Sequence, residues 1–178
     1  IHSSIFILVI LFLYYFRLIF LIIILWILRM KPKLVSDQLL LNLMKKKNDL
    51  IKEGQYNIPD NYIDYLGQVL DFHQNENVLP HIKKYDLIKG DATKTIYEYL
   101  DKNKHTMISL AYFDMQLYTP TKKCLEAIKP YLVTGAVIAM DEINNDEFPG
   151  ETVAFREVFG SGNYEIRKSK YLPDRSYM

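Results

Sequence analysis

The pattern of apolar and polar positions divides the 178-residue chain into an apolar N-terminal quarter and a longer part of mixed pattern. From Ile5 to Leu28, Arg17 is the only charged or strongly polar residue. A run of about 20 apolar residues is long enough to span the hydrocarbon core of a bilayer as a helix. We therefore predict a hydrophobic helix within residues 1–30.

This apolar run has two interpretations, and the sequence leaves both open. As a membrane anchor through Ile5 to Leu28, it would leave the rest of the chain in the cytoplasm, because basic residues follow at Arg29, Lys31 and Lys33. Against an anchor, Arg17 near the middle of a membrane span would cost about 2.5 to 3.5 kcal/mol. The alternative is a segment that is not native to the domain. The run is unlike a cleaved secretory signal, since no basic region precedes it and no small-residue cleavage site follows it.

Residues 31–56 are predicted to form a linker with a helix, and a domain is predicted from residue 57 to residue 178. Pro59 and Asp60 open a pattern in which Ile63, Leu66 and Leu70 recur at spacings of three and four, as on one face of an amphipathic helix. This helix is predicted to end near Asn75.

The remainder of the domain alternates between short apolar runs and helical patterns. Thr93 and Thr119 are predicted to cap two of the helices, and Pro120 suits a first helical position. The predicted strands are Tyr85–Ile88 (Lys84–Ile88 at its widest), Met107–Phe113 and Ala136–Met140, with a helix at Gly150–Phe159 and short strands at Tyr164–Lys168 and Ser176–Met178. Alternation of this kind predicts an α/β, Rossmann-like, doubly wound and mainly parallel sheet, with the three longer strands as neighbours.

Charge and cysteine content exclude some kinds of partner and site. The 22 basic and 21 acidic residues nearly cancel, so no strong field attracts nucleic acid. Cys124, the single cysteine, is expected to be a packed thiol in a reducing compartment. The histidines, His73, His81 and His105 among them, are too scattered to form a metal site. A homo-oligomer stays an open alternative.

Acidic residues follow each of the three predicted strands. Asp91 comes after the first, Asp114 after the second, and Asp141 with Glu142 after the third. Ligands bind beyond the carboxyl ends of such strands, and Mg²⁺ commonly takes one or two carboxylates. The alternative is structural, because aspartate after a strand often caps the following helix or turn. Glu151 either caps its helix, which is the favoured interpretation, or touches the active-site loop.

Several motifs resemble, in order, those of the macrocin O-methyltransferase and cephalosporin hydroxylase-like group of class I methyltransferases. The similarity covers residues 46–178. It is carried by Lys89-Gly90-Asp91-Ala92, by Ile108-Ser109-Leu110-Ala111-Tyr112-Phe113-Asp114 with Leu117-Tyr118 and Thr121, and by Asp141-Glu142 with Phe148-Pro149-Gly150-Glu151-Thr152.

The resemblance implies an S-adenosylmethionine-dependent, metal-assisted methyl transfer to a hydroxyl of a small-molecule acceptor, a sugar or a glycosylated metabolite. It implies that Gly90, Asp91 and Ala92 meet the adenine of the cofactor, with Asp114 at its methionine end. It further implies that Asp114, Asp141 and Glu142 hold Mg²⁺, with Asp114 and Asp141 as catalytic residues.

Two departures from the family pattern limit what the resemblance implies. Gln116 stands where relatives usually carry a second acid. No glycine-rich turn precedes Asp91, and the acid that would hold the ribose is missing with it. The family therefore predicts an enzyme, whereas the missing turn favours a truncated, catalytically silent remnant or a membrane-tethered binding module. We expect the chain by itself to bind the cofactor weakly.

Overall fold

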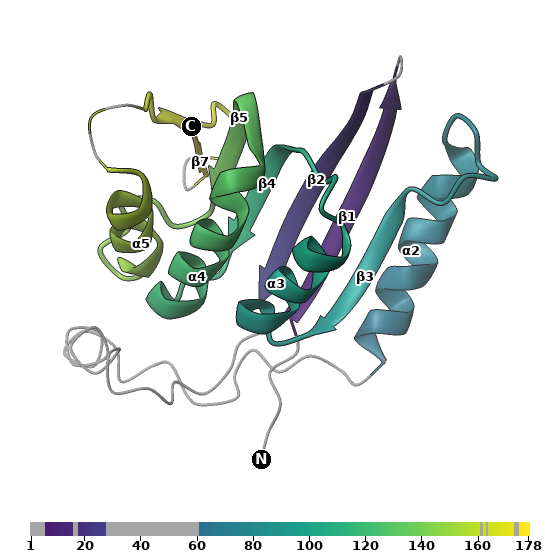
Figure 1. Cartoon of the computed structure of the whole chain (residues 1–178). Helices are drawn as coiled ribbons and strands as arrows, with labels where there is room; N and C mark the ends of the chain where they lie inside the picture. Colours follow the sequence, from purple (N-terminus) through teal and green to yellow (C-terminus); the bar gives the residue numbers. More distant parts are fainter. Residues whose placement is uncertain (1–5, 16–17, 28–60, 161, 163, 173–174) are drawn as a thin grey trace.

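The computed structural model describes residues 6–15, 18–27, 61–160, 162, 164–172 and 175–178. Within them a seven-stranded mixed sheet is flanked by helices (Figure 1), which confirms the predicted α/β class. The elements are β1 (Phe6–Tyr15), β2 (Leu18–Ile27), α2 (Tyr62–Glu76), β3 (Tyr85–Gly90), α3 (Ala92–Lys102), β4 (Ile108–Asp114), α4 (Tyr118–Ile128), η2 (Lys129–Tyr131), β5 (Leu132–Met140), α5 (Gly150–Phe159), β6 (Arg167–Lys168) and β7 (Ser176–Tyr177). The predicted linker and helix over residues 31–56 lie outside the described residues.

The strand order is β3-β1-β2-β4-β5-β7-β6. Strands β2, β4 and β5 are parallel neighbours, and β3 runs in the same direction because it is antiparallel to β1, which is antiparallel to β2. The carboxyl ends of these four strands consequently meet at one edge of the sheet. Strand β7 is antiparallel to β5, so its first residue, Ser176, also lies at that edge.

The predicted hydrophobic helix at the N-terminus is wrong, because this segment forms the hairpin of β1 and β2. Its register runs from Phe6 opposite Ile27 to Tyr15 opposite Leu18. The segment is rich in β-branched and aromatic residues, which favour strands, and an unbroken apolar run has no periodicity that separates strand from helix. No helix among the described residues is long and apolar enough to cross a membrane.

The same hairpin corrects the prediction that three parallel strands would be neighbours. Strands β4 and β5 do pair in parallel, but β1 and β2 lie between β3 and β4. The sheet is therefore mixed and not mainly parallel. In the usual doubly wound order, the first two strands lie between the third and the fourth, so the hairpin takes their place.

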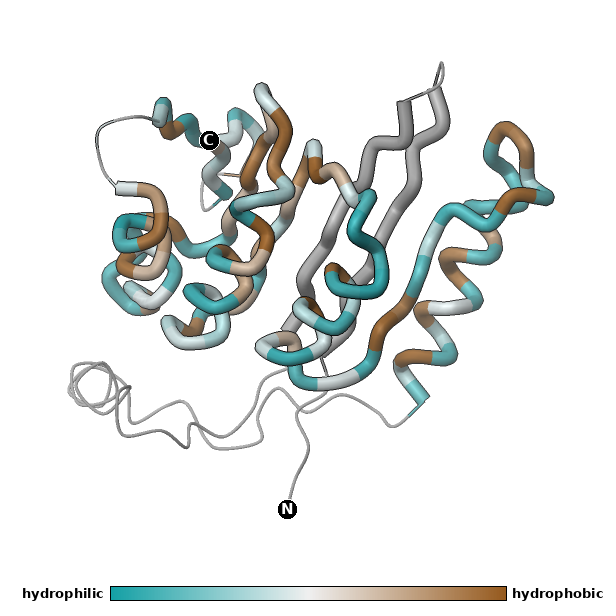
Figure 2. The backbone as a smooth tube through the Cα atoms, viewed as in Figure 1, coloured by the Kyte–Doolittle hydropathy of each residue, from teal (hydrophilic) through white to brown (hydrophobic). Residues whose placement is uncertain are grey.

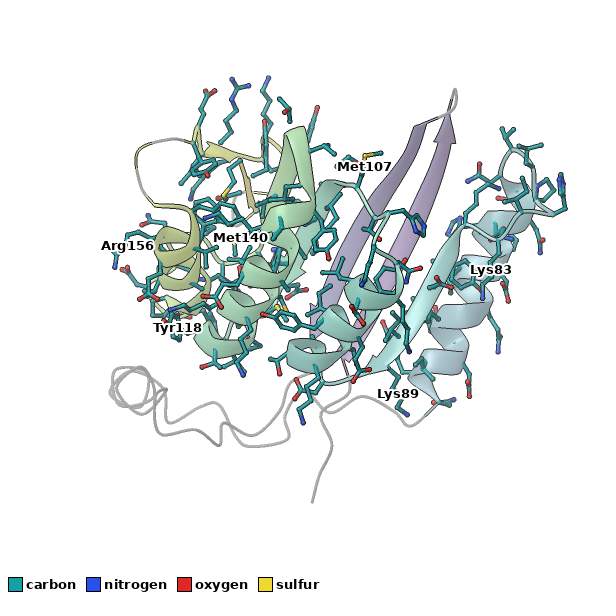
Figure 3. All side chains as sticks on the ribbon, viewed as in Figure 1. Lys83, Lys89, Met107, Tyr118, Met140 and Arg156 are labelled. Carbon is teal, nitrogen blue, oxygen red and sulfur yellow. The ribbon has the colours of Figure 1, made fainter. Side chains whose placement is uncertain are left out.

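Helices α3, α4 and α5 lie side by side over one face of the sheet (Figure 1), and α3 and α5 both contact α4. Helix α2 lies along β3, and brown and teal segments alternate along it in Figure 2, as the predicted amphipathic pattern requires. The core between sheet and helices contains side chains that are almost wholly buried, including Ile96, Ile108, Phe113, Leu125 and Ile128. Met140, labelled in Figure 3, belongs to this interior.

Two predicted helix caps are wrong. Helix α3 is capped by Asp91, whose side chain accepts a hydrogen bond from the backbone N–H of Thr93, so Thr93 lies inside the helix. Helix α4 begins after Leu117, and Thr119 is already helical. In both cases the helix starts closer to the preceding strand than the pattern suggested, which shortens the loop at the ligand-binding edge.

Candidate functional site

The acids predicted from the sequence lie at one edge of the sheet. Asp114 is the last residue of β4, Asp91 follows β3, and Asp141 with Glu142 follows β5. This placement confirms that the strand ends share an edge, as parallel strand direction requires. The contacts of each acid then decide what it can do.

Asp91 is a helix cap as well as a predicted adenine contact. Its Oδ1 accepts hydrogen bonds from the backbone N–H of Thr93 at 3.0 Å and from the Thr93 hydroxyl at 2.8 Å. Gly90 before it has a φ of 155°, and a Cβ there would lie 2.7 Å from the Thr95 methyl group. Ala92 is buried. The turn from Gly90 to Ala92 is thus compact, and Asp91 caps α3 whether or not a ligand binds.

Asp91 and Asp114 lie far apart along the edge. Three strand spacings separate β3 from β4, which at about 4.8 Å each amounts to roughly 14 Å. No single cation could contact both carboxylates. An extended ligand lying along the edge could contact Asp91 with one end and Asp114 with the other. The predicted roles of these residues at the adenine and methionine ends of the cofactor require such a ligand.

The carboxylate of Asp141 is enclosed by two donors. Only 9% of its side chain is exposed; Oδ1 forms an ion pair with Nε of Arg175 and accepts a hydrogen bond from the Tyr112 hydroxyl at 3.2 Å. Burial and the charge of Asp141 raise the pKa of Tyr112 to about 12, although Arg175 opposes the shift. Tyr112 is therefore a neutral donor at physiological pH.

Glu151 joins the loops that carry the acids. It is fully buried, and its carboxylate accepts backbone N–H bonds from Met115 at 2.7 Å, from Gln116 at 3.0 Å and from Glu142 at 3.0 Å. The first two donors follow β4 and the third follows β5. The expected helix-cap role of Glu151 is wrong, since α5 has no side-chain cap and the carboxylate binds these two loops instead.

The environment of Glu151 opposes its charge. Burial raises the pKa of this carboxyl, the three backbone donors lower it, and nearby Asp141 raises it slightly, so that the net pKa is about 7. The group is therefore balanced between a neutral and a charged form near neutral pH.

Gly150 allows α5 to approach the loop after β4. A Cβ at this position would lie 2.5 Å from the backbone oxygen of Gln116 and 2.7 Å from the backbone nitrogen of Tyr118. Gln116 itself has a φ of 58°. The Tyr118 hydroxyl donates to Glu157 of α5 at 2.5 Å, and Figure 3 shows Tyr118 beside that helix. Glycine is thus required for the contact between the two motifs that bear the site.

The predicted magnesium ligands do not form a ready cation site. Within the part of the chain that the structure describes, no three His, Cys, Asp or Glu side chains are grouped closely enough to hold a metal ion. Asp141 contacts Arg175, and Glu142 accepts a hydrogen bond from the side chain of Asn145. Asp114, Asp141 and Glu142 share an edge, but the carboxylates of Asp141 and Glu142 are already engaged by other side chains.

Sequence reasoning missed Arg175 and Tyr112, and misassigned Glu151. Arg175 precedes an antiparallel strand, so a search restricted to residues after parallel strands could not find it. Tyr112 is two residues before Asp114, and strand alternation places both on the same face, which is a usable signal. Cys124, in contrast, is the packed thiol that was predicted: it is buried, and burial raises its pKa.

Comparison with solved structures finds a methyltransferase. The crystal structure of CalS11, calicheamicin methyltransferase, is 37% identical with a TM-score of 0.66, over 74% of this chain and 51% of that chain. An apo structure of CalS11, titled TDP-rhamnose 3'-O-methyltransferase, an enzyme in calicheamicin biosynthesis, is 39% identical with a TM-score of 0.63, over 68% of this chain and 53% of that chain. The chain spans about half the length of these relatives. Neither a family model nor a curated protein sequence matches it.

Proposed function

Because the chain belongs to the macrocin O-methyltransferase-like group of class I methyltransferases, we propose that it serves in methyl transfer from S-adenosylmethionine to a sugar hydroxyl. The observation that carries this proposal is the 37–39% identity to a TDP-rhamnose 3'-O-methyltransferase. The acids at the carboxyl edge of the sheet support it, because that edge is where such sheets bind ligands. The acceptor is a small molecule, and a nucleotide-linked or otherwise glycosylated metabolite is the class to test.

The proposed roles follow the order of the acids along the edge. Asp91 accepts the amino hydrogen of the adenine, within the turn of Gly90 and Ala92. Asp114, roughly 14 Å away across three strand spacings, lies at the methionine end. The two residues can serve one extended ligand because their strands end at the same edge.

When bound, S-adenosylmethionine would supply an activated methyl group: the acceptor oxygen would bond to the methyl carbon as the carbon–sulfur bond breaks, S-adenosylhomocysteine would leave, and the hydroxyl would lose its proton. The contribution of the chain is to orient the acceptor hydroxyl toward the methyl group. Holding reacting atoms in contact in this way increases a reaction rate strongly. We propose Asp114 and Asp141 as the acids beside the reacting hydroxyl. Tyr112 holds the Asp141 carboxylate at Oδ1, so this acid has a set direction. The predicted role of Mg²⁺ at Asp114, Asp141 and Glu142 stays a prediction.

A methyl-transfer assay tests this function. The chain, saturated with S-adenosylmethionine, is offered a panel of nucleotide-linked deoxysugars, and release of S-adenosylhomocysteine is measured. We expect slow release of S-adenosylhomocysteine with at least one sugar. The rate of release should fall at least roughly tenfold in Asp114→Asn and should not change in Asp101→Asn. Asp101 is a matched control because it is exposed and pairs with Lys104 in a surface contact. Release that Asp114→Asn leaves unchanged would contradict the assignment.

The second candidate is a catalytically silent remnant. The observation that favours it is the hairpin of β1 and β2, which takes the place of the first two strands and contains neither glycine nor acid. On this hypothesis no sugar supports release of S-adenosylhomocysteine at any cofactor concentration. The same assay therefore separates the two candidates.

A further inference from the structure

We propose that Arg175 occupies the cation position at Asp141, so that Arg175 and a divalent cation compete for the same carboxylate. The choice of Asp141 rests on the proposed function, but cation binding at this carboxylate requires neither cofactor nor acceptor. It explains why acids arranged as in a metal-assisted enzyme do not form a ready metal site among the described residues.

The backbone holds Arg175 beside Asp141. Strand β7 pairs with β5 so that Ser176 is opposite Met140, the residue before Asp141. Arg175 is fixed on its other side, because its backbone oxygen accepts from the N–H of Ser169 at 2.9 Å and its own N–H donates to Leu172 at 3.0 Å. The arginine is therefore placed at the acid by the sheet and not by chance contact of a long side chain.

The electrostatics of the site favour one cation at a time. A buried carboxylate requires a compensating charge. The guanidinium of Arg175, whose side chain is 31% exposed, supplies this charge. A guanidinium does not lose its proton in proteins, so Arg175 cannot be neutralised when a second cation arrives. It has to leave Oδ1 of Asp141 physically, and the cost of that exchange lowers the affinity for the metal.

The exposure of Arg175 makes such an exchange feasible. Its side chain can rotate toward solvent, whereas Asp141 cannot, because Tyr112 and the adjoining backbone hold it. The backbone N–H of Asp141 donates to the oxygen of Phe113 at 3.1 Å, which ties the acid to the end of β4. Removing the arginine should leave a buried, oriented carboxylate that binds a cation more tightly.

Titration with Mn²⁺, followed by electron paramagnetic resonance of the free ion, tests the proposal on the whole chain. We expect Arg175→Gln to bind Mn²⁺ at least roughly tenfold more tightly than the unchanged chain, since a charged hydrogen bond no longer has to be broken. Arg167→Gln is the matched control, because Arg167 pairs with Glu165 in an exposed ion pair and should not alter Mn²⁺ binding.

Two further variants keep the test decisive. Circular dichroism checks that Arg175→Gln is folded. The Mn²⁺ affinity of Arg175→Lys, which keeps the charge, should stay within about threefold of that of the unchanged chain. The double variant Asp141→Asn with Arg175→Gln should lose the gained affinity, which would locate the ion at Asp141. Equal Mn²⁺ affinity in folded Arg175→Gln and the unchanged chain overturns the proposal, as does a gain that survives in the double variant.

Discussion

At the scale of single residues, the position of Glu151 explains how two loops from different strands are kept together. Its two carboxylate oxygens accept three backbone N–H groups, two from the loop after β4 and one from the loop after β5. A carboxyl group suits this position because both of its oxygens can accept hydrogen bonds, whereas an amide replaces one of these acceptors with an NH₂ donor.

Replacing Glu151 with glutamine is expected to lower the free energy of unfolding by about 1 to 3 kcal/mol. The amide oxygen can keep the bonds to Met115 and Gln116, but the NH₂ group then faces the N–H of Glu142, and two buried donors oppose each other. Urea denaturation measures the loss. Glu147→Gln, an exposed change in the loop between β5 and α5, should stay within about 0.5 kcal/mol, and an equally small effect of Glu151→Gln would refute the linking role.

The same residue predicts a dependence of stability on pH. The pKa of Glu151 is raised from 4.5 to about 7, so folding favours the neutral form. Its contribution to stability is complete below pH 4.5 and is lost as the pH rises through about 7. The difference in unfolding free energy between the unchanged chain and Glu151→Gln should therefore shrink from pH 5 to pH 7.5. A difference that is constant over this range would show that the pKa is not raised.

The positions of candidate site residues could be predicted from the sequence only where they follow from the strand itself. Asp114 and Asp141 come directly after buried strands, and parallel direction brings such ends to one edge. The pairing of Asp141 with Arg175 depends on the register of a two-residue antiparallel strand, which no local pattern specifies. Glu151 lies on a helix whose start suggested a cap, and only the tertiary approach of α5 reveals its other partners.

At the scale of elements, the approach of α5 to the loop before α4 depends on the absence of a side chain at Gly150. The atoms that a Cβ would meet belong to the backbone of Gln116, Leu117 and Tyr118, which cannot rotate away as a flexible side chain could. The contact between α5 and this loop also holds Glu151 at its three donors. A change at Gly150 should consequently disturb both loops at once.

Gly150→Ala is expected to destabilise the chain by about 1 to 3 kcal/mol, the usual cost of inserting a methyl group where no space exists. Thermal unfolding followed by circular dichroism measures the loss. Gly162→Ala is the matched control, because nothing lies within 4 Å of a Cβ built there. If both variants unfold at the same temperature, α5 can move away from the loop, and the close approach is not required.

Helices and strands were predictable where the apolar pattern and the residue composition indicate the same type of element. Helix α5 begins and ends where its pattern indicates, and β4 differs from the prediction by one residue at each end. The hairpin of β1 and β2 was not predictable, because an apolar run of this length suits a membrane helix and two buried strands equally. The pairing of β3 with β1 depends on that hairpin and could not be derived without it.

At the scale of the whole molecule, the two acids proposed to contact the cofactor lie on either side of an antiparallel hairpin. Strands β1 and β2 lie between Asp91 and Asp114, at the positions of the first two strands of a doubly wound sheet. The backbone of Trp26 is opposite Asp114, and the backbone of Phe6 is opposite Gly90. Under the proposed function, the affinity for the cofactor therefore depends on the contacts that the hairpin provides at this edge.

We expect residues 1–178 alone to bind S-adenosylmethionine more weakly than micromolar. A glycine turn normally lets the backbone approach the cofactor, and an acid after the second strand orients the ribose; neither residue type occurs in β1 or β2. With contacts left only near Asp91 and Asp114, little opposes the entropic cost of association, about 4 kcal/mol or more. Equilibrium dialysis with labelled cofactor measures the affinity, with full-length CalS11 as the comparison. Micromolar binding by this chain would mean that the hairpin, or the residues beside it, supplies the missing contacts by its backbone.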